Sequence, residues 1–138
     1  MTISAYITEL LKLYGDIEID INHVADGSDK YGLFKSPTRN IEKFNDGSYE
    51  ITEHYQFLAR QSTLSKSERK EVDEWLEDLT YWADDFCYKY KLPAIDKSRK
   101  VIGFSITGNP YPMEIEDRGT MYQISLSITY IREREEMW

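Results

Sequence analysis

The sequence predicts an α+β fold, a mostly antiparallel sheet covered on one face by two helices (an α-β-β-β-α-β-β two-layer sandwich). Two segments repeat apolar residues at helical spacing, and several others alternate apolar with polar residues, as half-buried strands do. An Asp-Gly pair between two alternating segments is typical of a tight hairpin, which joins antiparallel neighbours. A helix with one apolar stripe must bury it, so we expect both helices on the single apolar face of the sheet.

The first expected element is a short amphipathic helix over residues 2–14, followed by Gly15 at the position of a C-cap glycine. A strand with one buried face comes next, because Ile17, Ile19 and Ile21 alternate with polar residues. Residues 25–30 are a polar connection. Residues 31–37 are expected to be irregular or briefly extended, with exposed aromatic rings.

A hairpin is expected over residues 38–44 and 48–61, around Asn45-Asp46-Gly47. On its second strand Glu53 interrupts the apolar face and Leu58 interrupts the polar face. A long helix over residues 66–90 follows, preceded by a capping box in which Ser65 caps the first amides and Glu68 reaches back. A stripe at steps of three and four indicates its buried side: Val72, Trp75, Leu76, Leu79, Trp82, Phe86 and Tyr90.

The C-terminal part is predicted to be all strand. We expect strands over residues 101–107, 113–116 and 120–131, a proline-containing loop over 108–112, a turn over 117–119 and a charged tail over 132–138. A proline at position 93 ends the preceding helix, because it disfavours a helical residue before it. The whole chain, residues 1–138, is expected to be one domain.

Composition restricts the class of function. The chain has 17 Lys and Arg against 25 Asp and Glu, a net charge of −8, so it should not grip nucleic acid, whose binding requires cations. The lone Cys87 cannot form an internal disulfide, which suits a reducing compartment. Residues 1–14 are too short and too charged for a signal peptide or a membrane span, so we expect a cytosolic protein with no membrane partner.

Few residues are candidates for chemistry. Asp16, Glu18 and Asp20 would line one strand face and could offer oxygens to Mg²⁺ or Ca²⁺, but a solvated strand face explains them better. Residues 68–70 spell E-x-K, a fragment of some nuclease signatures, in a helix first turn where an acid is expected anyway.

The two histidines and the cysteine are equally weak candidates. His23 and His54 have no neighbouring ligand or partner at a useful spacing, and Cys87 lies beside acidic residues that do not activate a thiol. We therefore predict no catalytic, cofactor-binding or metal-binding residue, no cofactor and no enzymatic activity.

Surface features favour protein contacts. The long helix carries eight acidic and four basic residues. They form either an ordinary solvated face or an acidic surface that a negatively charged partner passes without binding. Four aromatic residues in expected loops and the tail are candidate subunit contacts: Tyr31, Phe34, Tyr111 and Trp138.

Several segments carry a family resemblance: YEITEHYQFLAR at 49–60, the capping box at 65–68, EWLE at 74–77 and the strand around 122–126. In these segments, and in the order of its elements over residues 3–131, the chain resembles the tail-terminator or minor capsid (head-tail joining) proteins of long-tailed phages of Gram-positive hosts. It is a likeness of layout rather than of an invariant signature.

The resemblance implies a non-enzymatic structural protein of a phage or prophage. Such α+β subunits close into a ring, commonly a hexamer, that caps the tail tube and later docks the filled head. The implied partners are further copies of the chain, the tail-tube protein and head-tail connector proteins, with DNA only passing through the lumen. The implied location is the neck of the virion, after assembly in the host cytoplasm. Residues 31–38 are the expected interface segment.

Two other hypotheses for the function stay open. The chain could be another head-tail connector or tail-completion protein, which have similar size and charge. It could also be a small cytosolic protein-binding module, such as an adaptor or antitoxin-like protein.

Overall fold

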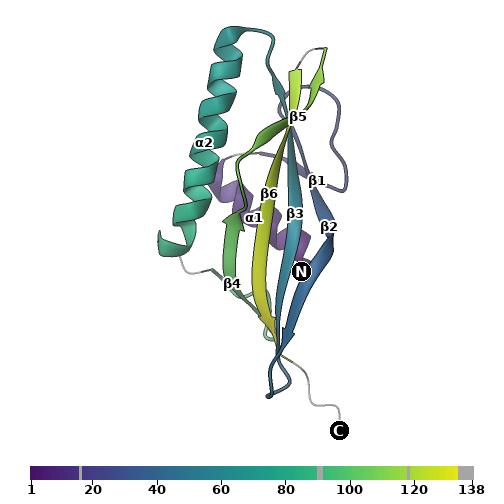
Figure 1. The fold of residues 1–138 in the computed structure, drawn as a ribbon, viewed down its shortest axis with the longest axis vertical. Helices are drawn as coiled ribbons and strands as arrows, with labels where there is room; N and C mark the ends of the chain where they lie inside the picture. The colour runs from purple at the N-terminus through teal and green to yellow at the C-terminus, as the bar shows by residue number, and fades with distance from the viewer. Residues whose placement is uncertain (16, 90–91, 118, 134–138) are drawn as a thin grey trace.

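The structure is a computed structural model that describes residues 1–15, 17–89, 92–117 and 119–133, without the side chains of 87–89. Within these residues the chain forms two helices and six strands (Figure 1). Their order is α1 (Ile3–Tyr14), β1 (Ile19–Ile21), β2 (Lys30–Lys43), β3 (Tyr49–Ser62), α2 (Lys66–Lys89), β4 (Arg99–Ile106), β5 (Tyr111–Glu116) and β6 (Gly119–Arg132). The predicted α+β two-layer sandwich is confirmed.

The strands form one sheet in the order β1-β2-β3-β6-β4, in which β5 also pairs with β6. The central strands β3 and β6 pair antiparallel over fourteen residue pairs, from Tyr49 opposite Arg132 to Ser62 opposite Gly119, without a register shift. Two strands share one side of β6, because β4 pairs with one half of it and β5 with the other. All pairings are antiparallel except the short parallel one between β1 and β2.

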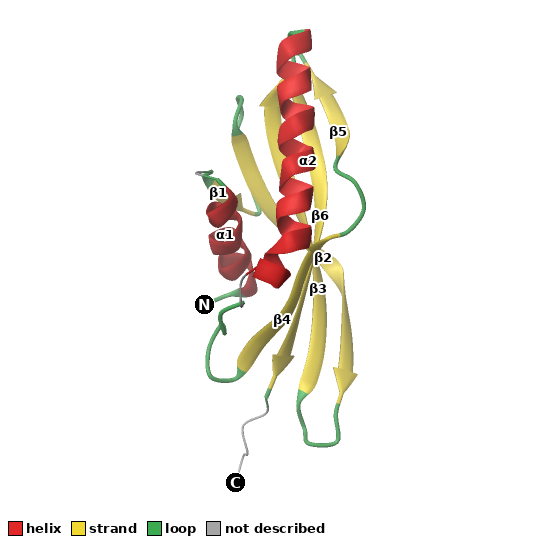
Figure 2. Cartoon of the chain, turned by 90° about the vertical axis from the view of Figure 1, so that its left-hand side faces the viewer, coloured by secondary structure: helices red, strands yellow, loops and turns green. Residues whose placement is uncertain are grey.

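Both helices pack their apolar stripes on one face of this sheet, which we call the covered face (Figure 2). Burial alternates along β3, as expected for a strand with one face in a core. The largest fully buried side chains come from both layers: Ile7 and Leu11 of α1, Leu79 of α2, and Leu33, Tyr55, Phe57, Ile124, Leu126 and Ile128 of the sheet.

Local signals account for both helix starts. The Thr2 side chain accepts a hydrogen bond from the Ala5 amide (3.1 Å) at the N-terminus of α1. The capping box of α2 is confirmed, since the Glu68 amide donates to Ser65 Oγ (3.0 Å) and the Ser65 amide donates to Glu68 Oε1 (3.2 Å). Gly15 does cap the C-terminus of α1, but in an extended rather than a left-handed conformation.

Residues 31–37, expected to be irregular or briefly extended, are part of the long strand β2, which runs from Lys30 to Lys43. A bulge interrupts the alternating pattern by which this strand could be recognised in the sequence. Three residues, 36–38, lie opposite His54 between two regular stretches of pairing. The strand expected over 17–21 is shorter, and its Ile21 is exposed. Tyr111 and Pro112, expected in a loop, belong to β5.

Gly32 marks a close approach between β2 and the loop that follows β1. A Cβ atom there would overlap the His23 carbonyl oxygen and the Val24 side chain. The loop therefore crosses the sheet on the face opposite the helices, and only glycine admits it at this point.

We expect Gly32→Ala to lower the free energy of unfolding by about 1–3 kcal/mol, because the loop backbone must move away from the strand. The matched control is Gly15→Ala, at a glycine with an extended backbone and no atom within 4 Å of the added Cβ. That control should stay within about 0.5 kcal/mol of the parent. Chemical denaturation measures both, and equal stabilities for the two variants would contradict the packing argument.

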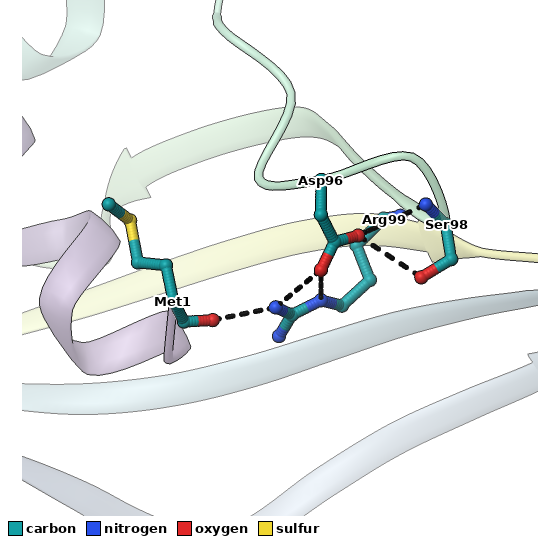
Figure 3. A network of polar contacts seen from close by, with 4 residues as sticks. All are labelled: Met1, Asp96, Ser98 and Arg99. Atoms are coloured by element: carbon teal, nitrogen blue, oxygen red, sulfur yellow. Dashed lines mark hydrogen bonds and ion pairs between the residues drawn. The ribbon is translucent and has the colours of Figure 1, made fainter.

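A turn before β4 is tied to the start of the chain (Figure 3). The Asp96 carboxylate accepts hydrogen bonds from the Ser98 and Arg99 amides (3.0 and 2.9 Å) and from Arg99 Nη2 (2.7 Å). The same guanidinium nitrogen donates to the Met1 carbonyl oxygen (2.6 Å). These donors, the Arg99 guanidinium above all, lower the pKa of Asp96 from 3.8 to about 2.

The stability that this network contributes should depend on acid. A lowered carboxyl pKa stabilises the folded state above the ordinary pKa of 3.8, and this contribution is lost as the pH falls toward 2. Asp96→Asn should therefore be less stable than the parent at neutral pH, and the difference should shrink toward about pH 2. Thermal unfolding across this range measures the difference, and a difference independent of pH would contradict the assignment.

Candidate assembly surface

The face of the sheet opposite the helices carries a polar cluster with apolar neighbours. Ser36, Gln56, Gln123 and Ser125 project from β2, β3 and β6 to this side. Phe34, Leu58 and Tyr111 occupy neighbouring register positions on the same side. We call these seven residues the uncovered patch.

Hydrogen bonds hold the polar part of the uncovered patch together across three strands. Gln56 Oε1 accepts from Gln123 Nε2 (2.6 Å) and from Ser125 Oγ (3.0 Å), while Gln56 Nε2 donates to Ser36 Oγ (3.3 Å). Cross-strand hydrogen bonds of this kind fix side-chain positions on a half-exposed sheet surface. The result is a neutral and ordered surface, which is suited to contact with another protein surface.

One end of this face is closed by charged contacts around Arg60. Its Nε donates to Glu116 Oε1 (2.8 Å), and its Nη1 donates to the Ala25 carbonyl oxygen and lies 3.7 Å from Asp26 Oδ1. A cavity of about 460 Å³ lies beside it, lined in part by Ser28 and Asp117. Asp26 and Glu116 are ion-pair partners of Arg60, so their presence beside the cavity has a structural explanation.

Of the four predicted contact aromatics, Tyr31 does not fit the expected exposure. It is 8% exposed, stacks on Phe57, and its hydroxyl accepts from Gln61 Nε2 (2.9 Å). Phe34 is half-buried and Tyr111 is 47% exposed, both on the uncovered patch, while Trp138 lies outside the described residues. The burial of Tyr31 follows from the unrecognised strand, whose alternation turns this ring toward the core.

The residues weighed for chemistry do not converge. Asp16 lies outside the described residues, and Glu18 and Asp20 are exposed near a three-residue strand. His23 is exposed in a loop, whereas His54 lies on β3 opposite Ser127. Among the described residues, no three His, Cys, Asp or Glu side chains are placed to share a metal ion. Cys87 is in α2, and its side chain is not described.

A shallow acidic groove lies between α2 and the loop after β4. It has a volume of about 270 Å³ and is lined by Asp73, Leu76, Glu77, Thr80, Tyr81, Asn109 and Pro110. Tyr81 is 56% exposed, and its hydroxyl donates to Glu77 Oε1 (2.8 Å). The acidic face of α2 is predictable from the sequence, but its position beside the loop that enters β5 is not, because the path of that loop depends on the pairing of β5 with β6.

Among the described residues, the covered face holds one buried carboxylate, at the point where β2 bulges. Glu53, 5% exposed, accepts a hydrogen bond from the Tyr130 hydroxyl (3.2 Å) and pairs with Lys35 Nζ (3.5 Å). Burial first, and then the Glu53 carboxylate, raise the pKa of Tyr130 to about 12. The carboxylate that interrupts the apolar face in the sequence is thus held by partners from two neighbouring strands.

The raised pKa predicts a loss of stability in alkali. An unfolded tyrosine ionises at its ordinary pKa of 10, so the contribution of Tyr130 is present below pH 10 and lost as the pH rises to about 12. Glu53→Gln should lower the pKa of Tyr130, because the neighbouring negative charge is removed. Tyrosinate absorbance against pH measures this pKa. The Tyr130→Phe substitution, made in the parent and in Glu53→Gln, identifies the part of the signal that comes from Tyr130. An unchanged pKa would contradict the contact.

Comparison with known proteins identifies no family: no protein-family model matches the sequence, and no curated protein matches it significantly. Neither helix of the described chain combines the length and apolar character that a membrane crossing requires.

Proposed function

We propose that the protein is a phage tail terminator, a non-enzymatic structural subunit that closes into a ring on the end of the tail tube and joins it to the head. Its partners in this proposal are further copies of itself in a ring, the tail-tube protein and head-tail connector proteins. It assembles in the host cytoplasm and ends in the neck of the virion.

The observation that carries the proposal is the two-layer fold with one sheet face left free of helices. The element order is the one that the family resemblance implies, and the uncovered patch offers an ordered surface rather than a site for chemistry. Tyr111, a predicted subunit contact, lies on that patch with Phe34. A subunit whose task is shape needs such surfaces and no convergent catalytic groups.

The charge of the chain supports a lumen through which DNA passes without being held. The net charge is −8, and many acidic residues of α2 are exposed, including Glu71, Glu74 and Asp78. Like charges repel DNA, so a ring of such subunits would let the duplex slide.

The alternatives make different use of the same surface. Another head-tail connector or tail-completion protein would also assemble through it, at a different level of the neck. A small protein-binding module would use the uncovered patch for one unrelated partner and form no ring.

Disruption of the gene in the phage tests the proposal. Without a terminator, tails should vary in length beyond the normal value and lack heads in electron micrographs, and the wild-type gene supplied in trans should restore both. Tails of normal length without heads would favour a connector instead. Normal tails with heads attached would contradict any role in the neck.

A further inference from the structure

Several strand edges of the sheet have no partner within the described residues, those of β2 and β5 among them. β1 pairs with β2 only at residues 31–33, so the outer side of β2 is free from Phe34 to Lys43. β5 pairs with β6 on one side only. These edges belong to opposite borders of the sheet, and Figure 2 shows β5 toward one end of the molecule and the β2–β3 hairpin at the other. Free edges are ready templates for pairing with another chain.

The free edge of β2 is basic on the covered face. Lys35, Arg39 and Lys43 stand opposite Tyr55, Glu53 and Tyr49 of β3, all on the side where the helices pack. Lys35 and Lys43 each lie over a tyrosine ring, with 5.9 Å from the ammonium nitrogen to the ring centre. Arg39 and Lys43 are exposed. The bulge adds two residues, so the basic side chains before and after it keep the same side.

The border that carries β5 is acidic on the same side of the sheet. Asp73 and Glu77 of α2 line the groove beside the loop that enters β5, whereas Glu114 of β5, opposite Met121, lies on the other side of the sheet. Asp73 and Glu77 are both exposed. Apolar side chains accompany them on β5, where Met113 and Ile115 are 43% and 82% exposed. An acidic and partly apolar border is complementary to the basic edge of β2 with its exposed Ile41.

We infer that the free edge of β2 in one copy docks against the β5 border of the next copy, with Arg39 and Lys43 entering the acidic groove of α2. The occupant of each edge is a second copy of this chain, because each copy carries both complementary borders. This inference rests on the proposed ring and specifies its contact. The contact is heterologous, so it closes into a ring when the rotation between copies divides a full turn.

The faces of the two sheets agree with this arrangement. When β2 of one copy pairs antiparallel with β5 of the next, the side that carries the helices in one copy continues as that side in the next. The basic side chains of β2 and the acidic residues of α2 both lie on that side. Proline lacks an amide hydrogen, so backbone pairing is confined to stretches without it, residues 38–43 of β2 and 113–116 of β5.

Charge reversal on each border, followed by recombination, tests the contact. The basic-edge variant carries Arg39→Glu and Lys43→Glu, and the groove variant carries Asp73→Lys and Glu77→Lys. The control variant carries Lys12→Glu and Glu71→Lys, at exposed positions on neither border. The solution mass of each protein is measured at high concentration and low ionic strength, because salt screens such contacts. Circular dichroism checks that every variant is folded.

We expect the wild type and the control to form oligomers, each reversed variant to be monomeric, and an equal mixture of the two reversed variants to regain the oligomer with alternating subunits. Oligomers of each reversed variant as large as those of the wild type would overturn this contact while leaving the ring proposal intact. A mixture that stays monomeric, or a wild type that never associates, would also overturn it. The gene disruption described above decides the ring proposal separately.

Discussion

The unbroken pairing of β3 with β6 is the constraint on which the rest of the structure depends. Side chains alternate along a strand, so a constant register over fourteen pairs keeps most apolar side chains of both strands on one side. Tyr55 and Leu126 meet there, as do Phe57 and Ile124, beneath the two helices. The chain can cover this side with α1 and α2, and the other side is left to polar cross-strand contacts.

The outer strands keep their core residues aligned with this central pair by means of bulges. β2, β4 and β5 each shift register once, and the shifts place groups that regular alternation would misplace. In β4 the extra residue Ile102 points to solvent, so Val101 and Phe104 can both reach the core at a spacing of three. In β2 the bulge lies beside Glu53, whose carboxylate is held by Lys35 and Tyr130.

Much of the fold could be predicted because its signals are local. The capping box, the apolar stripe of α2 and the alternation of β3 and β6 each lie within one segment. The first half of β2 could not be predicted, because Gly32 and the bulge at residues 36–38 break its pattern and only the neighbouring strands explain them. The error on Tyr31 follows directly from this.

The candidate surface was predictable only in part. Tyr111 and Phe34 were found as aromatic residues in expected loops, yet they share a surface because β5 and β2 pair with strands that bring them to one side. The Gln56 cluster has no signal in the sequence, since its members come from three strands and are ordinary polar residues. The register between β2, β3 and β6 brings these residues together.

The two-residue bulge of β2 also limits how this hairpin can vary in length. Loss of both extra residues would restore a regular strand and leave Arg39, Ile41 and Lys43 on their present side. Loss of only one would rotate every later side chain of β2 by half a turn and bring Asn40 and Glu42 to the helix side. Insertions and deletions of an even number of residues should therefore be tolerated in this strand, whereas those of an odd number should not. Natural variants of the hairpin should differ by even numbers of residues.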